Sequence, residues 1–174
     1  MMSQNVLEQG RRLLLWVLLL LGAQQGLTAG IIQAKAWLAP KLIERAWQQS
    51  LADGVEGVKP WPWADTWPVA RMRIASRGID QFVLAGDSGN VLAFSPGHAR
   101  ASAPVGSVGR AVIGGHRDTH FAFLQDLSLG ASVTLELPDG LVRHYSVEDL
   151  AIVDASRQPL EYSQAREELM RVTC

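Results

Sequence analysis

The sequence contains almost no cysteine. Its single cysteine, Cys174, is also the last of 174 residues. A lone cysteine cannot form an internal disulfide, so the usual structural use of cysteine in an exported protein is excluded. A free thiol is open to oxidation in an oxidising compartment, so it is a liability there unless it has a chemical role. Two interpretations follow: Cys174 is a small buried apolar residue, or it is a nucleophile.

An excess of charge of either sign is also missing. The chain has 16 Lys and Arg against 17 Asp and Glu, a formal net charge of −1. Nucleic-acid binding usually requires concentrated positive charge, so we expect no nucleic-acid partner. The sequence contains no internal repeat and no low-complexity tract. With 48% hydrophobic residues, it is typical of a globular domain with one apolar end.

The longest apolar stretch lies near the N-terminus. It spans residues 13–32, follows two arginines and is interrupted by two glutamines. About 20 helical residues, at about 1.5 Å each, are enough to cross a bilayer core of about 30 Å. A small-x-small triplet at 34–36 leaves open the alternative of a cleaved signal peptide. Because apolar residues resume after the glutamines, we expect an uncleaved membrane anchor, although basic residues on both sides do not set its orientation.

Three parts are expected along the chain. Residues 1–34 form a cytoplasmic tail and transmembrane anchor, residues 35–58 a stalk helix and linker, and residues 59–174 a globular domain. A one-sided apolar pattern over residues 33–51, broken early by a proline, indicates the stalk helix. The segment 53–68 combines glycine and proline with three tryptophans, a composition that favours an extended boundary segment.

Short strands separated by turns dominate the rest of the chain. Glycine- and proline-containing turns separate the β-prone runs, and no long amphipathic helix interrupts them. This pattern predicts a mainly β fold, either a barrel or a sandwich. Short helices are expected at 121–129 and 163–170. The expected strands are 69–74, 81–85, 91–94, 110–113, 132–137, 143–147 and 169–173.

The densest group of chemically competent side chains lies in residues 114–121, directly after an apolar strand. Two glycines let the backbone turn sharply there, which places His116 at a strand end. Cys174 ends another short strand. A thiol of ordinary pKa is only about 3% ionised at pH 7, whereas a neighbouring imidazolium stabilises the thiolate and can protonate a leaving amine. The sequence therefore offers a cysteine and a histidine for a catalytic pair.

Two other interpretations of the histidines stay open. His116 and His120 have the spacing of two zinc ligands on one helix face, but the zincin motif has a glutamate where this chain has Arg117. The preceding strand and glycines also argue against a helix. The alternative without chemistry is that either histidine only forms hydrogen bonds in a polar turn.

Four short fragments occur in a fixed order along the chain. They are Lys-Pro-Trp-Pro-Trp-Ala-Asp at 59–65, Pro-Gly-His at 96–98, Gly-His-Arg-Asp-Thr-His-Phe at 115–121 and Val-Thr-Cys at 172–174. This ordered set resembles the signature of the sortase family, and most of all its class GN from Gram-negative bacteria. The resemblance implies an eight-stranded β-barrel in which Cys174 is the nucleophile and His116 the general acid and base. The implied reaction cleaves a C-terminal sorting motif through a thioester acyl-enzyme and transfers it to an amine.

The resemblance also implies partners and a location. The substrate is an exported protein bearing the sorting motif, the second substrate is an amine acceptor, and no metal or organic cofactor is needed. Such an enzyme works outside the cytoplasm. We therefore expect a single-pass protein of the inner membrane with its catalytic domain facing the periplasm.

One part of the family's site has no counterpart in the sequence. Sortases carry an arginine on the strand after the cysteine, where it holds substrate and stabilises the oxyanion, whereas this sequence stops at Cys174. Neither Arg171 nor Arg117 is assigned that role. We therefore expect a barrel domain truncated at the catalytic cysteine, with its last strand missing. The alternative function is an inactive, membrane-tethered binding or assembly module on the same barrel.

Five further residues are candidates for the site. His98 matches the family's Pro-Gly-His element, and we expect it to be a substrate-side or structural residue. Arg117, Asp118, Thr119 and His120 follow the catalytic position directly, and we expect them to orient its loop through hydrogen bonds or to contact the substrate.

Overall fold

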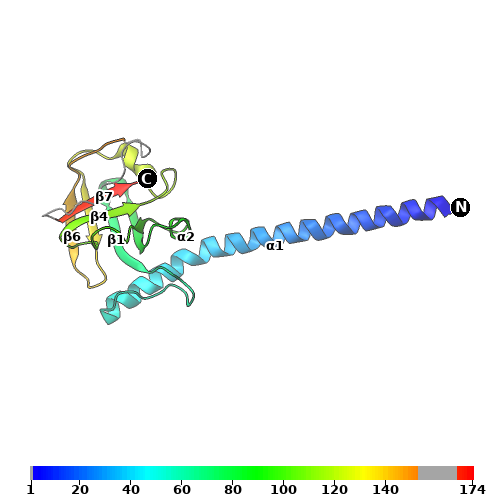
Figure 1. Ribbon diagram of the computed structural model, residues 1–174, viewed down its shortest axis with the longest axis horizontal. Coiled ribbons are helices and arrows are strands. Elements are labelled where there is room, and N and C mark those ends of the chain that lie inside the picture. Colours follow the sequence, from blue (N-terminus) through cyan, green and yellow to red (C-terminus); the bar gives the residue numbers. More distant parts are fainter. Residues whose placement is uncertain (1, 153–167) are drawn as a thin grey trace. The chain divides into compact units, whose positions relative to one another are not determined.

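The computed structural model describes residues 2–152 and 168–174. The chain divides into two compact units, Met1–Ala39 and Pro40–Cys174. The first unit belongs to one long helix, and the second contains the end of that helix and a sheet of seven strands (Figure 1). The predicted domain boundaries at residues 34 and 58 stay predictions.

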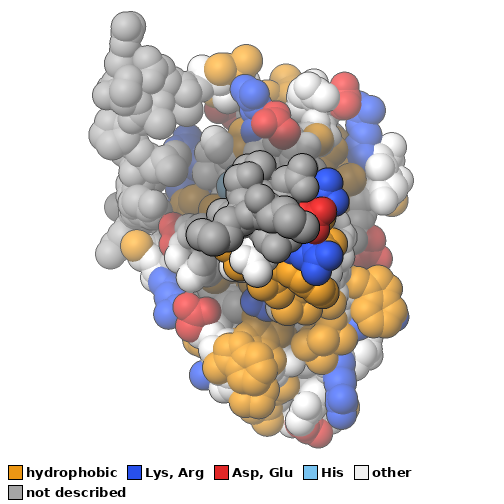
Figure 2. Space-filling view, turned by 90° about the vertical axis from the view of Figure 1, so that its right-hand side faces the viewer, with side chains coloured by type: hydrophobic (Ala, Val, Ile, Leu, Met, Phe, Trp, Pro, Cys, Tyr) orange, Lys and Arg blue, Asp and Glu red, His pale blue; other side chains and the backbone are white. Residues whose placement is uncertain are grey.

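The helix α1 (Met2–Asp53) is long and strongly apolar. Within residues 2–152 and 168–174, it is the one helix long and apolar enough to cross a membrane, with a hydropathy of 1.7 in its most apolar window. Side chains from Leu13 to Leu21 are 45–69% exposed. Figure 2 shows large hydrophobic side chains exposed together on one face of the molecule. The apolar pattern is interrupted at Pro40, yet the helix continues through this residue.

The last turns of α1 are core elements of the second unit. Ile43 is 2% exposed and belongs to a buried cluster with Leu84 and Val91. The Trp47 side chain is fully buried, and its ring centroid lies 5.8 Å from that of Phe82. Burying each large apolar side chain contributes about 1.5–3 kcal/mol. The stretch predicted as a stalk helix is therefore helical, and its C-terminal half stabilises the domain.

The sheet is mixed and curls into a half-barrel, which confirms the predicted mainly β fold. Its strand order is β6-β5-β1-β2-β3-β4-β7, and neighbours are antiparallel except β2–β3 and β4–β7, which are parallel. An eighth strand is not among the described residues. The strands are β1 (Pro68–Ile74), β2 (Ile79–Ala85), β3 (Gly97–His98), β4 (Gly109–Gly114), β5 (Ser132–Glu136), β6 (Val142–Ser146) and β7 (Glu168–Thr173).

Every second side chain of β1 packs inside the curled sheet. Ala70, Met72 and Ile74 are at most 1% exposed, while the arginines between them are partly exposed on the other face. This is the period of two expected of a strand with one buried face. The same core contains buried side chains from the neighbouring strands and from the loop after β4, namely Val83, Ile113, Phe121, Val133 and Leu135.

The strand predicted at 91–94 is wrong. Its first two residues belong to the short helix α2 (Gly89–Leu92), in which the Leu92 N–H bonds to the Ser88 carbonyl. Val91 is buried in the core, so its apolar character reflects packing rather than strand structure. Residues 97–98, where the sequence predicts no strand, form β3. A helical turn suits this connection because β2 and β3 are parallel and the chain must cross over between them.

The two predicted short helices have different outcomes. The one at 121–129 is a 3-10 helix, η2 (Ala122–Asp126). Residues 163–167 of the other lie outside the described residues, and its last three residues, 168–170, belong to β7. A further 3-10 helix, η1 (Ala75–Arg77), connects β1 to β2 and ends at Gly78, whose φ of 63° favours glycine.

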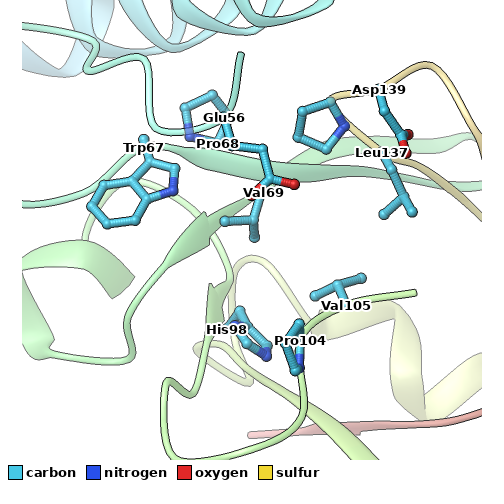
Figure 3. A pocket seen from close by; sticks show the side chains of 10 residues that line it. Glu56, Trp67, Pro68, Val69, His98, Pro104, Val105, Leu137 and Asp139 are labelled. Carbon is cyan, nitrogen blue, oxygen red and sulfur yellow. The ribbon is translucent and has the colours of Figure 1, made fainter. Parts of the chain in front are cut away.

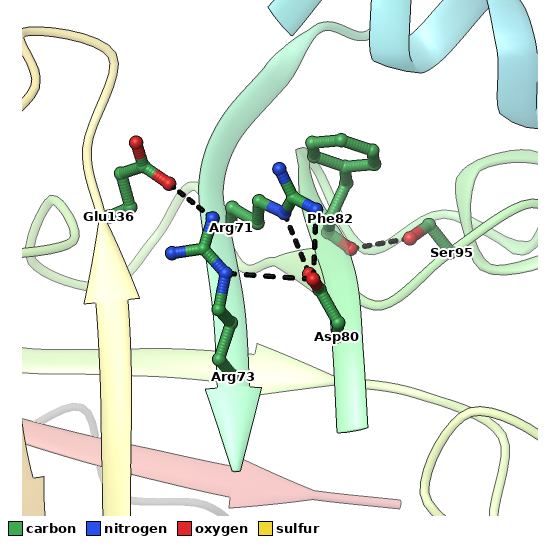
Figure 4. Close-up of polar contacts among 6 residues, drawn as sticks. All are labelled: Arg71, Arg73, Asp80, Phe82, Ser95 and Glu136. Carbon is green, nitrogen blue, oxygen red and sulfur yellow. Dashed lines mark hydrogen bonds and ion pairs between the residues drawn. The ribbon is translucent and has the colours of Figure 1, made fainter. Parts of the chain in front are cut away.

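A charged network crosses β1, β2 and β5 on the face opposite the core (Figure 4). The Arg71 guanidinium donates to both oxygens of Asp80, at 2.6 Å and 2.8 Å. Arg73 Nη2 lies 2.7 Å from Glu136 Oε2. The hydrogen bonds from Arg71 hold the pKa of the Asp80 carboxyl below its ordinary value.

Asp80→Asn is expected to lower the free energy of unfolding at pH 7 by about 0.5–1 kcal/mol, since exposed ion pairs are screened by solvent. Because the folded pKa lies below the unfolded one, Asp80 stabilises the fold above its unfolded pKa, and this contribution is lost as pH falls through the folded pKa. Urea unfolding should therefore show the difference from wild type shrinking below about pH 4. Asp126→Asn, a change at an exposed aspartate at the end of η2, is the control. The prediction is contradicted if the difference in unfolding free energy for Asp80→Asn stays constant down to pH 3. It is also contradicted if Asp126→Asn lowers the free energy of unfolding by the same amount.

Candidate active site

The ends of β4 and β7 bring the two predicted catalytic residues to the same edge of the sheet. The strands are parallel neighbours in register from Gly109↔Glu168 to Gly114↔Thr173, and Figure 1 shows β7 ending at the C-terminus beside β4. Past this register, the Gly115 N–H donates to the Thr173 carbonyl at 3.0 Å. Cys174 directly follows Thr173, and His116 directly follows Gly115. Both side chains are exposed.

A tight turn presents the His116 side chain to solvent. The Phe121 N–H donates to the His116 carbonyl at 3.0 Å, and the Thr119 N–H donates to the same oxygen at 3.3 Å. Phe121 is 1% exposed in the core, and a Cβ atom at Gly115 would lie 2.9 Å from its ring. Glycine at 115 therefore lets the buried ring pack directly under the start of the turn.

The loop residues predicted to orient His116 differ in their contacts. Arg117 Nε lies 3.1 Å from Asp118 Oδ1, and both side chains are about four-fifths exposed, at 79% and 83%. The His120 side chain is partly buried. Burial, with the nearby His116 charge, lowers the pKa of His120. Arg117, Asp118 and Thr119 are exposed, so His120 is the one of these four side chains that the fold partly covers.

His98 is a buried, hydrogen-bonded residue. Its Nε2 lies 2.8 Å from the Ala103 carbonyl and 3.2 Å from Ser102 Oγ, and that hydroxyl accepts a bond from the Val112 N–H. These contacts fold the segment after β3 back onto β4. His98 also lines a cavity of about 110 Å³, where Figure 3 shows it beside Pro104. Of the two roles expected for His98, these contacts supply the structural one.

His98→Ala is expected to lower the free energy of unfolding by about 1–3 kcal/mol, because the variant leaves the Ala103 carbonyl without this partner. The rate of Cys174 alkylation by iodoacetamide in the folded variant should match that of the wild type. Chemical denaturation and alkylation kinetics measure the two quantities separately. A variant of unchanged stability with a slower thiol reaction would assign His98 to the substrate side instead.

A larger cavity of about 490 Å³ adjoins β7 and reaches Thr173, the residue before the cysteine. Its walls come from β1, β4, β5, β6, β7 and η2, so the local patterns used for the sequence predictions did not identify it. The period-two alternation of β1, which directs Met72 and Ile74 to one face, is the one signal that pointed toward it. The apolar part of its lining is Met72, Ile74, Phe123, Leu124, Leu127, Val133, Met170 and Val172.

The zinc interpretation requires further ligands around His116 and His120. Among residues 2–152 and 168–174, no group of three or more His, Cys, Asp or Glu side chains could hold a metal ion. The segment after His116 is a turn followed by a 3-10 helix, so the two histidines do not share the face of an α-helix. The helical zinc motif considered from the spacing is therefore not formed.

Comparisons with known proteins agree with this geometry. A family model described as Sortase domain matches residues 72–174. A Clostridium perfringens Sortase D5 transpeptidase shares 19% identity over 79% of this chain and 89% of its own, with a TM-score of 0.60. Sortase C-1 from Actinomyces oris shares 23% over 62% of this chain and 63% of its own, with a TM-score of 0.52.

Sortase A from Corynebacterium diphtheriae shares 17% identity over 88% of this chain and 87% of its own, with a TM-score of 0.52. At identities this low, the likeness to the three solved structures concerns the fold. No curated protein matches the chain.

Proposed function

The chain belongs to the sortase family, whose members are cysteine transpeptidases, and on that premise we propose that Cys174 is the nucleophile of a transpeptidase with His116 as its partner. The observation that carries the proposal is the parallel register of β4 and β7, which ends both strands at one edge, one residue before Cys174 and two residues before His116. Catalytic groups at strand ends are held by the sheet and are accessible to a substrate.

The reaction follows from the chemistry of the pair. The Cys174 thiolate, stabilised by the His116 imidazolium, attacks the backbone carbonyl of a sorting motif near the C-terminus of an exported protein. The carbon–nitrogen bond breaks, His116 donates its proton to the departing amine, and a thioester forms. An incoming amine gives its proton to His116 and attacks the thioester, which expels the Cys174 thiolate, restores the thiolate–imidazolium pair and leaves a new amide bond. Water in place of the amine gives hydrolysis as a slow side reaction.

The cavity beside β7 supplies a place for the peptide. It reaches Thr173, has an apolar lining, and carries charged side chains, among them Arg171 and Glu148, around it. Peptide sites commonly combine an apolar floor with a few polar groups that set orientation. In this proposal the residues of the sorting motif that precede the cleaved bond lie along β7.

Membrane anchorage through α1 is part of the same proposal. Its exposed leucines and its length fit a single pass, with the catalytic domain in the periplasm of a Gram-negative cell. Assignment to class GN rests on the ordered combination of the fragments at 59–65, 96–98, 115–121 and 172–174. The solved structures compared above come from Gram-positive organisms and inform the fold only.

The test is detection of the acyl-enzyme. Full-length protein would be incubated with peptides covering the C-terminal regions of exported proteins from the same genome, and its intact mass measured. We expect an acyl adduct on Cys174 that an added amine, such as triglycine, releases as a peptide product. The proposal fails if no peptide gives an adduct and the Cys174 thiol reacts with iodoacetamide no faster than a free cysteine.

A further inference from the structure

The tryptophan-rich segment 59–67, Lys-Pro-Trp-Pro-Trp-Ala-Asp-Thr-Trp, is fixed to the second unit on both sides of its middle. On one side, the Trp61 ring packs edge-on against that of Phe94, with the two centroids 5.4 Å apart. On the other side, the buried Thr66 hydroxyl donates to the Ala85 carbonyl at 2.8 Å. The backbone of the segment therefore follows the surface of the domain closely.

Arg100 adds a further attachment to the second half of this segment. Its Nη2 donates to the Asp65 carbonyl at 2.7 Å. The same guanidinium lies over the Trp67 ring, 5.2 Å from its centroid, within the range of a cation–π contact. The chain on this side is thus held by side-chain contacts as well as by packing.

Trp63 points out of this otherwise attached segment. The Ala64 N–H donates to the Trp61 carbonyl at 3.0 Å, which closes a four-residue turn. Pro62 occupies the second position of the turn, where its fixed φ is favoured, and Trp63 occupies the third. The Trp63 side chain is 83% exposed, more than any other tryptophan in the described chain, while Ala64 beside it is 3% exposed. A fixed turn thus holds the largest type of side chain out in the solvent.

This turn lies close to the place where α1 enters the second unit. Trp61 packs against the buried cluster that contains Ile43, and Ile43 is in the first helical turn of that unit, which begins at Pro40. The apolar stretch of α1 ends at residue 32, so eight residues (40 − 32) connect the two. Eight helical residues span about 12 Å. When α1 crosses a bilayer, the turn therefore lies within reach of the membrane surface.

The chemistry of the exposed ring fits lipid headgroups. Tryptophan is enriched at membrane–water interfaces because most of its ring is apolar while its N–H can bond to headgroups or water. The headgroup layer adds about 5–8 Å on each side of the hydrocarbon core. α1 itself carries an exposed tryptophan, Trp37, five residues past the apolar stretch. Neither cavity described above is lined by Trp63, so this side chain is not part of the proposed peptide site.

Resting on the membrane anchorage in the proposed function, we propose that Trp63 is a second membrane contact. Its ring inserts among the lipid headgroups and docks the second unit on the membrane surface. A single helix tethers a domain at one point, about which the domain can turn. A second contact beside the helix fixes which side of the domain faces the bilayer, and with it the direction in which the edge carrying Cys174 is presented.

The single cysteine allows a direct measurement on the full-length chain. In a Cys174→Ala background, Trp63→Cys, Leu129→Cys and Leu18→Cys each provide one thiol for labelling with the fluorophore nitrobenzoxadiazole. Each labelled protein is reconstituted into nanodiscs of phosphatidylcholine and phosphatidylglycerol. The discs are prepared with and without lipids that carry a nitroxide quencher in the headgroup or in the acyl chain. Emission wavelength and quenching are then compared among the three positions.

Leu129 is the matched control on the same unit. Its side chain is 65% exposed. It precedes β5, where Thr134 pairs with Arg73 near the end of β1, whereas the tryptophan-rich segment leads into the start of β1 at Pro68. The length of β1 separates these two ends of the sheet by about 20 Å. A label at position 129 should therefore stay in water.

The label at position 63 is expected to emit at a shorter wavelength than the label at 129. Headgroup nitroxides should quench it about twofold or more, with little effect at 129. Trp63→Ala with Cys174 retained should form the acyl-enzyme with a soluble peptide at the wild-type rate. The inference is overturned if positions 63 and 129 are quenched equally. It is also overturned by a shorter wavelength at 63 without quenching, which indicates a protein partner, or by slower acylation of Trp63→Ala, which indicates substrate contact.

The label at position 18 separates this inference from the proposed anchorage. Quenching at 18 by acyl-chain nitroxides, with none at 63, supports the anchor and overturns the second contact alone. No quenching at 18 contradicts membrane anchorage through α1, and the inference is then wrong as well. The transpeptidase proposal is tested apart from both, because detection of the acyl-enzyme does not depend on the nanodisc.

Discussion

Replacing Cys174 by alanine in the full-length protein is expected to abolish thioester formation, and replacing His116 by alanine is expected to slow it by about a thousandfold or more. The first variant has no nucleophile. The second keeps the thiol but loses both the cation that stabilises the thiolate and the acid that protonates the leaving amine. Intact-mass measurement of the acyl-enzyme and single-turnover kinetics with the same peptide give the two rates.

The His116 variant also makes a prediction about the reactivity of the thiol. Without the imidazole as a partner, Cys174 should be alkylated by iodoacetamide more slowly than in the wild type at the same pH. Arg77→Ala, a change at an exposed position on η1, is the control and should behave as wild type. A thioester captured on the Cys174→Ala protein would show that another residue is the nucleophile.

Gly97→Ala is expected to lower the free energy of unfolding by about 3 kcal/mol or more. A Cβ atom at this position would clash with the Gly86 carbonyl oxygen, a backbone atom that cannot move aside alone. The segments are held together by the bond from the Gly86 N–H to the His98 carbonyl, at 2.8 Å, and by pairing of Leu84 with Gly97. Overpacking against fixed backbone is among the larger single-residue penalties.

Gly89→Ala is the matched control for this prediction. Gly89 is the first residue of α2, and a Cβ atom there would meet nothing within 4 Å. Alanine should be neutral or stabilising by up to about 1 kcal/mol, since it restricts the unfolded chain. Urea denaturation of the two variants beside wild type measures the contrast. Equal stabilities for both alanine variants would contradict the close approach of β3 to Gly86.

The elements of the fold that follow local rules could be predicted from the sequence. The alternation over Pro68–Ile74 and the apolar run at Gly109–Gly114 gave strands because side-chain period and β propensity agree there. The error at 91–94 arose because Val91 is apolar for a tertiary reason, its burial against α1, which no local pattern encodes. β3 was missed because two residues are too few to produce any pattern.

The site divides in the same way. Cys174 and His116 were predicted as the catalytic pair from their places at strand ends and from the family resemblance. They lie at the same edge of the sheet only because β4 and β7 are adjacent and parallel. That adjacency is a non-local property. The partner of His98 was also beyond prediction, because Ala103 offers only a backbone carbonyl, which every residue type has.

The parallel pairing of β4 with β7 also affects when the thiol becomes reactive during folding. Gly109 pairs with Glu168, so this pairing joins positions 59 residues apart (168 − 109), whereas Ile74 and Ile79 of the β1–β2 pair are 5 apart (79 − 74). Closing the longer loop costs more chain entropy, and distant pairings form later than local ones. Before that step the cysteine is remote from the imidazole and has the low reactivity of an isolated thiol. The chain would thus acquire its proposed nucleophile only as β7 joins the sheet, and unwanted thiol chemistry is limited until then.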